Sequence, residues 1–221
     1  MLKLVVLASG RGSNLQAIVN AIERGQLHAK LLAVFSDKAD ANALNIARAA
    51  GAQAIHVDPK LFGSRVAFDE ALFTQVEQLE PDLIVLAGFM RILSAGVVER
   101  NAGRMINIHP SLLPKHKGLH THRQAIESGD SEHGASVHLV TAELDGGPVL
   151  AQARVCVLPD DTEETLASRV LSVEHPLLIA CLNEWQRGHF TYAPPQLLYR
   201  GDVMECPLEY QADSTALMPL L

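Results

Sequence analysis

The stretch LKLVVLASGRGSNLQ, residues 2–16, joins an apolar run, a glycine-rich turn and the start of a helical pattern. The run at 2–8 is continuous and rich in Leu and Val, which is typical of a strand buried on both faces. Two glycines then permit a tight turn, and apolar residues at helical spacing follow at 15–23. This order of strand, turn and helix predicts an α/β fold built on a parallel sheet.

The same alternation continues along most of the chain. We expect strands at 30–35, 54–57, 83–87, 105–109, 135–140 and 149–158, and helices at 41–50, 66–79, from 94, at 124–128 and from 162 to about 185. Residues 110–134 are rich in Pro, Gly and His and predict a long, functional loop. The fold class is therefore α/β, as a three-layer, Rossmann-like, mostly parallel twisted sheet with helices on both faces.

The length of 221 residues suits one sizeable core. We expect a single domain over residues 1–200. The tail at 201–221 has four acidic residues, no basic residue and two prolines. It is expected to be surface-draped or disordered.

Composition excludes several classes of partner. The formal net charge is -7 and like charges are not clustered, so we expect no nucleic-acid partner. No apolar stretch approaches the ~20 residues that span a bilayer, so we expect no membrane association. Three widely spaced cysteines fit a reducing compartment. The sequence predicts a cytoplasmic protein with small-molecule partners.

The glycine turn at 9–15 resembles a phosphate-binding loop, because backbone amides at a helix N-terminus stabilise an anion. It lacks the Gly-Lys-Ser/Thr of a nucleoside triphosphate loop, and Leu15 stands where a dinucleotide loop has its third glycine. These features favour a single phosphate. The alternative is that Ser13 to Gln16 form only a capping box. Arg11 favours the anion, since capping does not need a guanidinium.

Asn107 and His109 lie two apart at the end of an expected strand, so their side chains face the same side. Pro110 ends that strand at the carboxyl edge, where open α/β sheets bind ligands. Asp145 begins a turn with Gly146, and its alternative role is that of a turn former. A carboxylate near His109 would raise the imidazole pKa and keep it cationic near neutrality.

Together these three residues supply an amide, an imidazole and a carboxylate without a serine or cysteine nucleophile. The set suits direct acyl transfer between two amines, with the oxyanion held by the amide and imidazole and protons moved by the carboxylate and a water. His120 and His122 raise the possibility of zinc. Without a matching carboxylate or cysteine pair the signal is weak, so we expect no metal.

Four ordered motifs carry a family resemblance. They are Ser9-Gly10-x-Gly12-Ser13-Asn14-Leu15-Gln16, Leu86-Ala87-Gly88-Phe89-Met90-Arg91-Ile92-Leu93, Asn107-Ile108-His109-Pro110-Ser111-Leu112-Leu113-Pro114 and Glu143-Leu144-Asp145-Gly146-Gly147-Pro148. On these motifs the chain resembles the phosphoribosylglycinamide formyltransferases from about Leu4 to His175. The resemblance implies the formyltransferase fold and transfer of the formyl group of 10-formyltetrahydrofolate, the cosubstrate, to the amine of 5'-phosphoribosylglycinamide in purine biosynthesis.

The resemblance also implies roles for individual residues. The catalytic set would be Asn107, His109 and Asp145. The residues implied for the phosphate and ribosyl glycinamide are Gly12, Ser13, Asn14 and Glu174. Those implied for the folate are Arg65, Met90, Arg91, Ile92, Leu93, Asn107 and Thr141. Residues 110–134 would form a mobile lid. Lys117 and Pro176 depart from the family pattern, and the chain is expected to be a monomer or homodimer.

Two rival readings remain open. Other formyltetrahydrofolate enzymes, the deformylases and methionyl-tRNA formyltransferases, share the Asn-x-His and Ser-Leu-Leu-Pro pattern. They are expected to carry a further domain, for which 221 residues leave little room. The second alternative is a non-catalytic folate- or nucleotide-binding module. The presence of Asn107, His109 and Asp145 argues against it.

Overall fold

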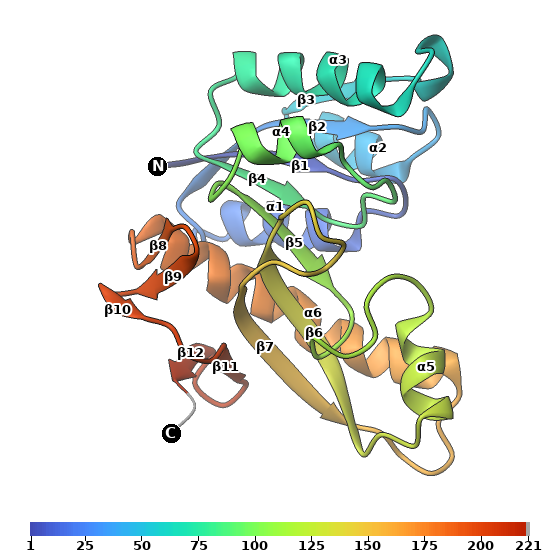
Figure 1. Cartoon of the computed structure of the whole chain (residues 1–221), viewed down its shortest axis with the longest axis vertical. Helices are drawn as coiled ribbons and strands as arrows, with labels where there is room; N and C mark the ends of the chain where they lie inside the picture. Colours follow the sequence, from blue (N-terminus) through green and yellow to red (C-terminus); the bar gives the residue numbers. More distant parts are fainter. Residues whose placement is uncertain (220–221) are drawn as a thin grey trace. The chain divides into compact units, whose positions relative to one another are not determined.

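The computed structural model describes residues 1–219 of the chain (Figure 1). The chain divides into two compact units, Met1–Asn107 with Val140–Ala142, and Ile108–Leu139 with Glu143–Leu221. The expected single domain over residues 1–200 stays a prediction. Residues 220–221 of the expected tail lie outside the described residues.

The first unit alternates strands and helices in the order that the sequence predicts. Its elements are β1 (Leu2–Leu7), α1 (Ser13–Glu23), β2 (Ala29–Ser36), α2 (Asn42–Ala49), β3 (Gln53–His56), the 3-10 helix η1 (Pro59–Leu61), α3 (Arg65–Gln78), β4 (Leu83–Leu86), α4 (Ala95–Arg100) and β5 (Met105–His109), whose last two residues belong to the second unit. Neighbouring strands are parallel, in the order β5-β4-β1-β2-β3. The expected parallel sheet is confirmed here.

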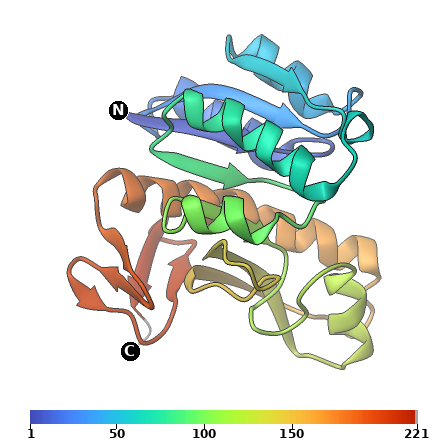
Figure 2. The ribbon, with the colours of Figure 1, turned by 45° about the horizontal axis from the view of Figure 1, so that its top comes forward.

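Side chains of β1 alternate between two buried faces of this sheet. Val5 and Leu7 belong to a core cluster with apolar side chains of α3 and α4, and Figure 2 shows these two helices across the same face. Leu4 and Val6 are fully buried on the opposite face. Helices α1 and α2 pack against β2 and contribute no residue to the first cluster. The expected arrangement with helices on both faces is confirmed in this unit.

The second unit contains a mixed sheet, one long helix and a small hairpin sheet. Its elements are α5 (Thr121–Glu127), β6 (Glu132–Leu139), β7 (Val149–Cys156), α6 (Glu163–Gln186), β8 (Phe190–Ala193), β9 (Gln196–Tyr199), β10 (Asp202–Val203), β11 (Leu208–Gln211) and β12 (Ala216–Pro219). Strands β6 and β7 are antiparallel, whereas β11 lies parallel to β7. Strands β8, β9 and β10 form an antiparallel sheet of their own.

Helix α6 occupies nearly the residues that the sequence predicts, 162 to about 185. Its 24 residues could cross a membrane by length and composition alone. In the structure it packs against β6 and β7, with Leu166, Val170 and Leu177 fully buried. Thr162 caps its N-terminus through a reciprocal pair of hydrogen bonds with Thr165. We therefore interpret α6 as a core helix of this unit.

The tail differs from the expected surface-draped or disordered segment over its described part. Strand β11 continues the sheet beside β7, and β12 pairs antiparallel with β11. Leu208, Tyr210 and Leu217 are buried. The physical reason is the alternation of Leu208 and Tyr210, two apart, which gives a short strand one apolar face. The acidic composition of the tail concealed this pattern.

Glu184 connects α6 to the hairpin that follows it. Its carboxylate accepts hydrogen bonds from the Tyr199 hydroxyl at 2.6 Å and from His189 Nδ1 at 2.7 Å. Arg187 also donates to it. Burial opposes ionisation of Glu184, but these donors outweigh it and lower its pKa to about 2. The carboxylate therefore stabilises the join between helix and hairpin as an anion.

We expect Glu184→Gln to lower the free energy of unfolding by about 2 kcal/mol in urea titrations, because charged hydrogen bonds are lost at a buried site. The folded pKa lies below the ordinary 4.5, so the contribution is fully present above that pH and is lost as the pH falls towards about 2. Glu127→Gln, an exposed change in the same unit, is the control. Equal loss in both variants, or no loss in either, would contradict the role of Glu184.

Candidate active site

A buried imidazole and a buried carboxylate bring together two of the predicted catalytic residues. Asp145 Oδ2 lies 3.6 Å from His109 Nδ1, and both side chains are less than a tenth exposed. His109 ends β5, while Asp145 lies in the turn between β6 and β7 with a left-handed φ of 47°. Aspartate tolerates this conformation better than most residues. The structure thus brings these two residues together, and their catalytic roles stay predictions.

His138 is a neighbour that the sequence analysis did not single out. It lies on β6, is buried, and its Nε2 is 3.6 Å from Asp145 Oδ1. Its Nδ1 donates to the Leu139 carbonyl at 2.8 Å, since a carbonyl can only accept. The Asp145 carboxylate therefore lies between two imidazoles. The available signal was a polar ring inside an otherwise apolar strand run.

Asp145 is stabilised as an anion. Burial raises its pKa, but the neighbouring His138 ring, the hydrogen bond from the Gly118 backbone N–H and the neighbouring His109 ring lower it overall. The Gly118 N–H donates to Oδ2 at 2.8 Å. A carboxylate in this state can accept a proton or orient a water.

The expectation that His109 is cationic near neutrality is wrong for the structure as it stands. The ring is 5% exposed, and burial lowers its pKa below the ordinary value although the His116 carbonyl and Asp145 act in the opposite direction. Desolvation therefore outweighs the carboxylate that the sequence analysis relied on. Protonation of this ring needs a further negative charge near it.

Residues of the segment at 110–134 contact the same two side chains or their neighbours. His109 Nε2 donates to the His116 carbonyl at 2.9 Å, while the His116 ring bonds Asp130 Oδ2 at 2.7 Å. Lys115 Nζ bonds Asp130 Oδ1 and Lys117 Nζ bonds Glu143 Oε1, both at 2.8 Å. These bonds, with that from the Gly118 N–H to Asp145, hold the segment at 115–118 in its unit.

His122 and His133, in the segment at 110–134, are two neighbouring histidines with lowered pKa values. His122 Nδ1 lies 3.1 Å from His133 Nε2. Burial and the neighbouring His122 and His116 lower the pKa of His133 to about 4. No group of three or more His, Cys, Asp or Glu within residues 1–219 is arranged to hold a metal ion.

Asn107 and Thr141 belong to the first unit, and each is half-buried. Asn107 precedes His109 by two residues in β5. Glu174 belongs to the second unit, where it is buried on α6. Their assignments to catalysis and substrate binding stay predictions.

The glycine turn is shaped by its approach to α2. Gly12 has φ 76° and forms the N-cap of α1, and no side chain among the described residues caps this helix. The capping-box alternative is therefore wrong, because Ser13 lies inside the helix. A Cβ at Gly12 would come within 3.1 Å of Ala43 Cα, and Asn42 Nδ2 donates to the Arg11 carbonyl at 3.0 Å. Gly12 therefore suits this turn because a larger residue would collide with α2.

The predicted folate residues of the first unit differ in exposure. Met90 and Ile92 are 66% and 52% exposed, respectively, which suits side chains that contact a ligand. Leu93 instead packs in the core cluster with α3 and α4. Arg91 lies 3.7 Å from Asp37 and stacks over the Phe68 ring. Arg65 begins α3 and is exposed.

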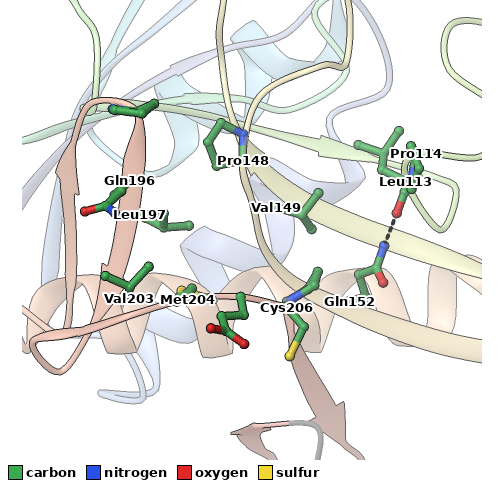
Figure 3. Close-up of a pocket in the computed structure, with 13 residues that line it drawn as sticks. Leu113, Pro114, Pro148, Val149, Gln152, Gln196, Leu197, Val203, Met204 and Cys206 are labelled. Carbon is green, nitrogen blue, oxygen red and sulfur yellow. Dashed lines mark hydrogen bonds between the residues drawn. The ribbon is translucent and has the colours of Figure 1, made fainter.

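A pocket of about 460 Å³ lies elsewhere in the second unit (Figure 3). It is lined by Leu113, Pro114, Pro148, Val149 and Gln152, together with residues of the β8–β11 region. Gln152 Nε2 donates to the Leu113 carbonyl at its wall. No predicted site residue lines this pocket, so its volume gives no guide to the chemistry.

A family model described as formyl transferase matches residues 2–182. The chain belongs to the formyl transferase family. It is 53% identical over 182 residues to phosphoribosylglycinamide formyltransferase of Escherichia coli strain K12. The aligned region covers 81% of this chain and 86% of that protein.

Solved structures agree with this formyl transferase assignment. The phosphoribosylglycinamide formyltransferase from Coxiella burnetii matches with a TM-score of 0.89 and 45% identity over 92% of this chain and 95% of that one. Glycinamide ribonucleotide transformylase 1 from Symbiobacterium toebii matches with a TM-score of 0.86 and 40% identity over 90% and 94%. The family match ends inside α6, so Glu184 and the strands after it lie beyond the matched residues.

We expect Gly12→Ala to lower the free energy of unfolding by about 1–3 kcal/mol, because it forces a side chain into the left-handed region and against α2. Gly10→Ala is the matched control, since nothing lies within 4 Å of a Cβ at that position. Urea titration measures both. Loss of stability of the same size in the two variants would contradict the close approach of Gly12 to α2.

Proposed function

We propose that this enzyme transfers the formyl group of 10-formyltetrahydrofolate to the amine of 5'-phosphoribosylglycinamide, giving formylglycinamide ribonucleotide and tetrahydrofolate. The observation that carries the proposal is the buried Asp145 carboxylate beside His109, in a chain of the formyl transferase family. The relatives named phosphoribosylglycinamide formyltransferase support this acceptor.

The proposed reaction uses the carboxylate of Asp145 and the imidazole of His109. The acceptor amine attacks the formyl carbon, the carbonyl becomes an oxyanion, and the bond to the folate nitrogen then breaks. We assign the oxyanion to Asn107 and His109. A developing negative charge raises the pKa of the His109 ring, so the buried neutral imidazole can hold the proton that the attacking amine releases while the oxyanion exists. Asp145, through a water, moves the proton from the attacking to the leaving nitrogen.

Substrate binding is assigned to the remaining predicted residues. The turn of Gly12, Ser13 and Asn14 would hold the phosphate, because the N-terminus of α1 has no side-chain cap in the described residues. Glu174 would meet the ribosyl glycinamide. The folate would contact Arg65, the segment at 90–93, Asn107 and Thr141. We expect only small-molecule substrates, a cytoplasmic protein, and a monomer or homodimer.

We expect His109→Ala and Asp145→Asn each to lower kcat by about 100-fold or more with little change in KM, because both residues act on charge that develops in the transition state. His28→Ala, which removes an exposed histidine, is the control. Folate absorbance with and without the acceptor amine measures the rate. Equal formyl release without acceptor would identify a deformylase, and unchanged kcat in both variants would refute the assigned roles.

The phosphate turn has a separate test. We expect ribosyl glycinamide without its 5'-phosphate to bind at least about 100-fold more weakly, because charge-assisted bonds to backbone amides are lost. Arg11→Ala should give a smaller loss with the phosphorylated substrate. Isothermal titration calorimetry measures both affinities. Equal affinity with and without the phosphate would contradict this assignment of the turn.

A further inference from the structure

Two backbone groups of one short segment contact both His109 and Asp145. The His116 carbonyl accepts from His109 Nε2 at 2.9 Å. Two residues later, the Gly118 N–H donates to Asp145 Oδ2 at 2.8 Å. Because a carbonyl can only accept, the proton of a neutral His109 ring lies on Nε2, and Nδ1 is left facing Asp145.

The carbonyl of His116 points toward the His109 ring because His116 adopts an unusual backbone conformation. His116 has φ 53°, in the left-handed region that disfavours a residue with a side chain. Such a conformation persists only where the surroundings hold it. The surroundings here are the ring bond from His116 Nε2 to Asp130 Oδ2 at 2.7 Å, and the bond from Ser111 Oγ to the Lys115 carbonyl, also at 2.7 Å.

Asp130 is well suited to hold that ring. Its pKa is lowered by hydrogen bonds from Lys115 and then His116, so it remains a carboxylate near neutrality. The His116 ring is 12% exposed, and the Asp130 carboxylate 14%. A charged acceptor in a half-enclosed site restricts the ring more strongly than a solvent-exposed pair would.

We propose that His116 is a positioning residue, which acts through Asp130 to hold the backbone carbonyl that sets the tautomer and orientation of His109. Its ring does not touch the reacting atoms. The proposal rests on the proposed function only for its effect on turnover, since the tautomer of His109 is a property of the protein alone. The charged or titratable groups that act on His109 are Asp145, His138, His122 and His133, and all of them remain in the variants below.

The test uses His116→Phe, which keeps a ring but removes its nitrogens, and Asp130→Ala, which removes the acceptor. Nitrogen-15 NMR of labelled histidine reports the His109 tautomer, with the His109→Ala spectrum giving the assignment. We expect both variants to show a mixture of His109 tautomers in place of the Nε2–H form. We also expect kcat to fall by about 10-fold with KM nearly constant, as for loss of one bond to a reacting group.

Lys115→Ala is the control. It removes the bond from Lys115 to Asp130 and should change neither the His109 tautomer nor kcat.

Several outcomes overturn the proposal. A wild-type His109 tautomer in both folded variants does so, even if kcat falls, because the loss would then be merely structural. A tautomer change in Lys115→Ala equal to that in the other variants also does so. Absence of formyl transfer by the unmodified enzyme would refute the proposed function instead, while the NMR result would still decide the role of His116.

Discussion

The site depends on one buried carboxylate. Asp145 remains ionised inside the second unit because the His138 ring and the Gly118 backbone N–H lower its pKa. An ionised group without such partners would be protonated or drawn to the surface. The left-handed turn that carries Asp145, the ring on β6 and the segment at 115–118 all serve this requirement. The chemistry assigned to His109 also depends on this carboxylate. The ring has a lowered pKa, and Asp145 is the anion beside it when it takes up a proton.

Much of the fold could be predicted because local patterns decide it. The apolar run at 2–8 and the following glycines predicted a strand, a turn and a helix. The same alternation of short apolar runs with helical patterns predicted the other parallel strands of the first unit. Helix α6 was found from its start at Thr162, which is its cap. The strands of the tail were not predicted, because two short strands with one apolar face give a weak pattern within an acidic segment.

The site was predictable where spacing along the chain carries the information. Asn107 and His109 stand out because they lie two apart at a strand end, and Asp145 because it starts a glycine turn. The direction of the His109 pKa was missed, since desolvation depends on everything packed around a ring and no motif encodes it. The bond between His116 and Asp130 was missed for a related reason. It joins residues fourteen apart through a loop whose path only the three-dimensional structure gives.

The strand pairing of β11 has a further consequence for how this protein behaves among its own copies. Along one side, β7 offers backbone donors and acceptors that β11 partly occupies. A sheet edge that is left open is a template for adding strands from another molecule. Residues 208–219 therefore cover part of the β7 edge, and β12 becomes the outer strand in its place. A segment without an assigned part in the chemistry thus decides which strand lies at the edge of this sheet.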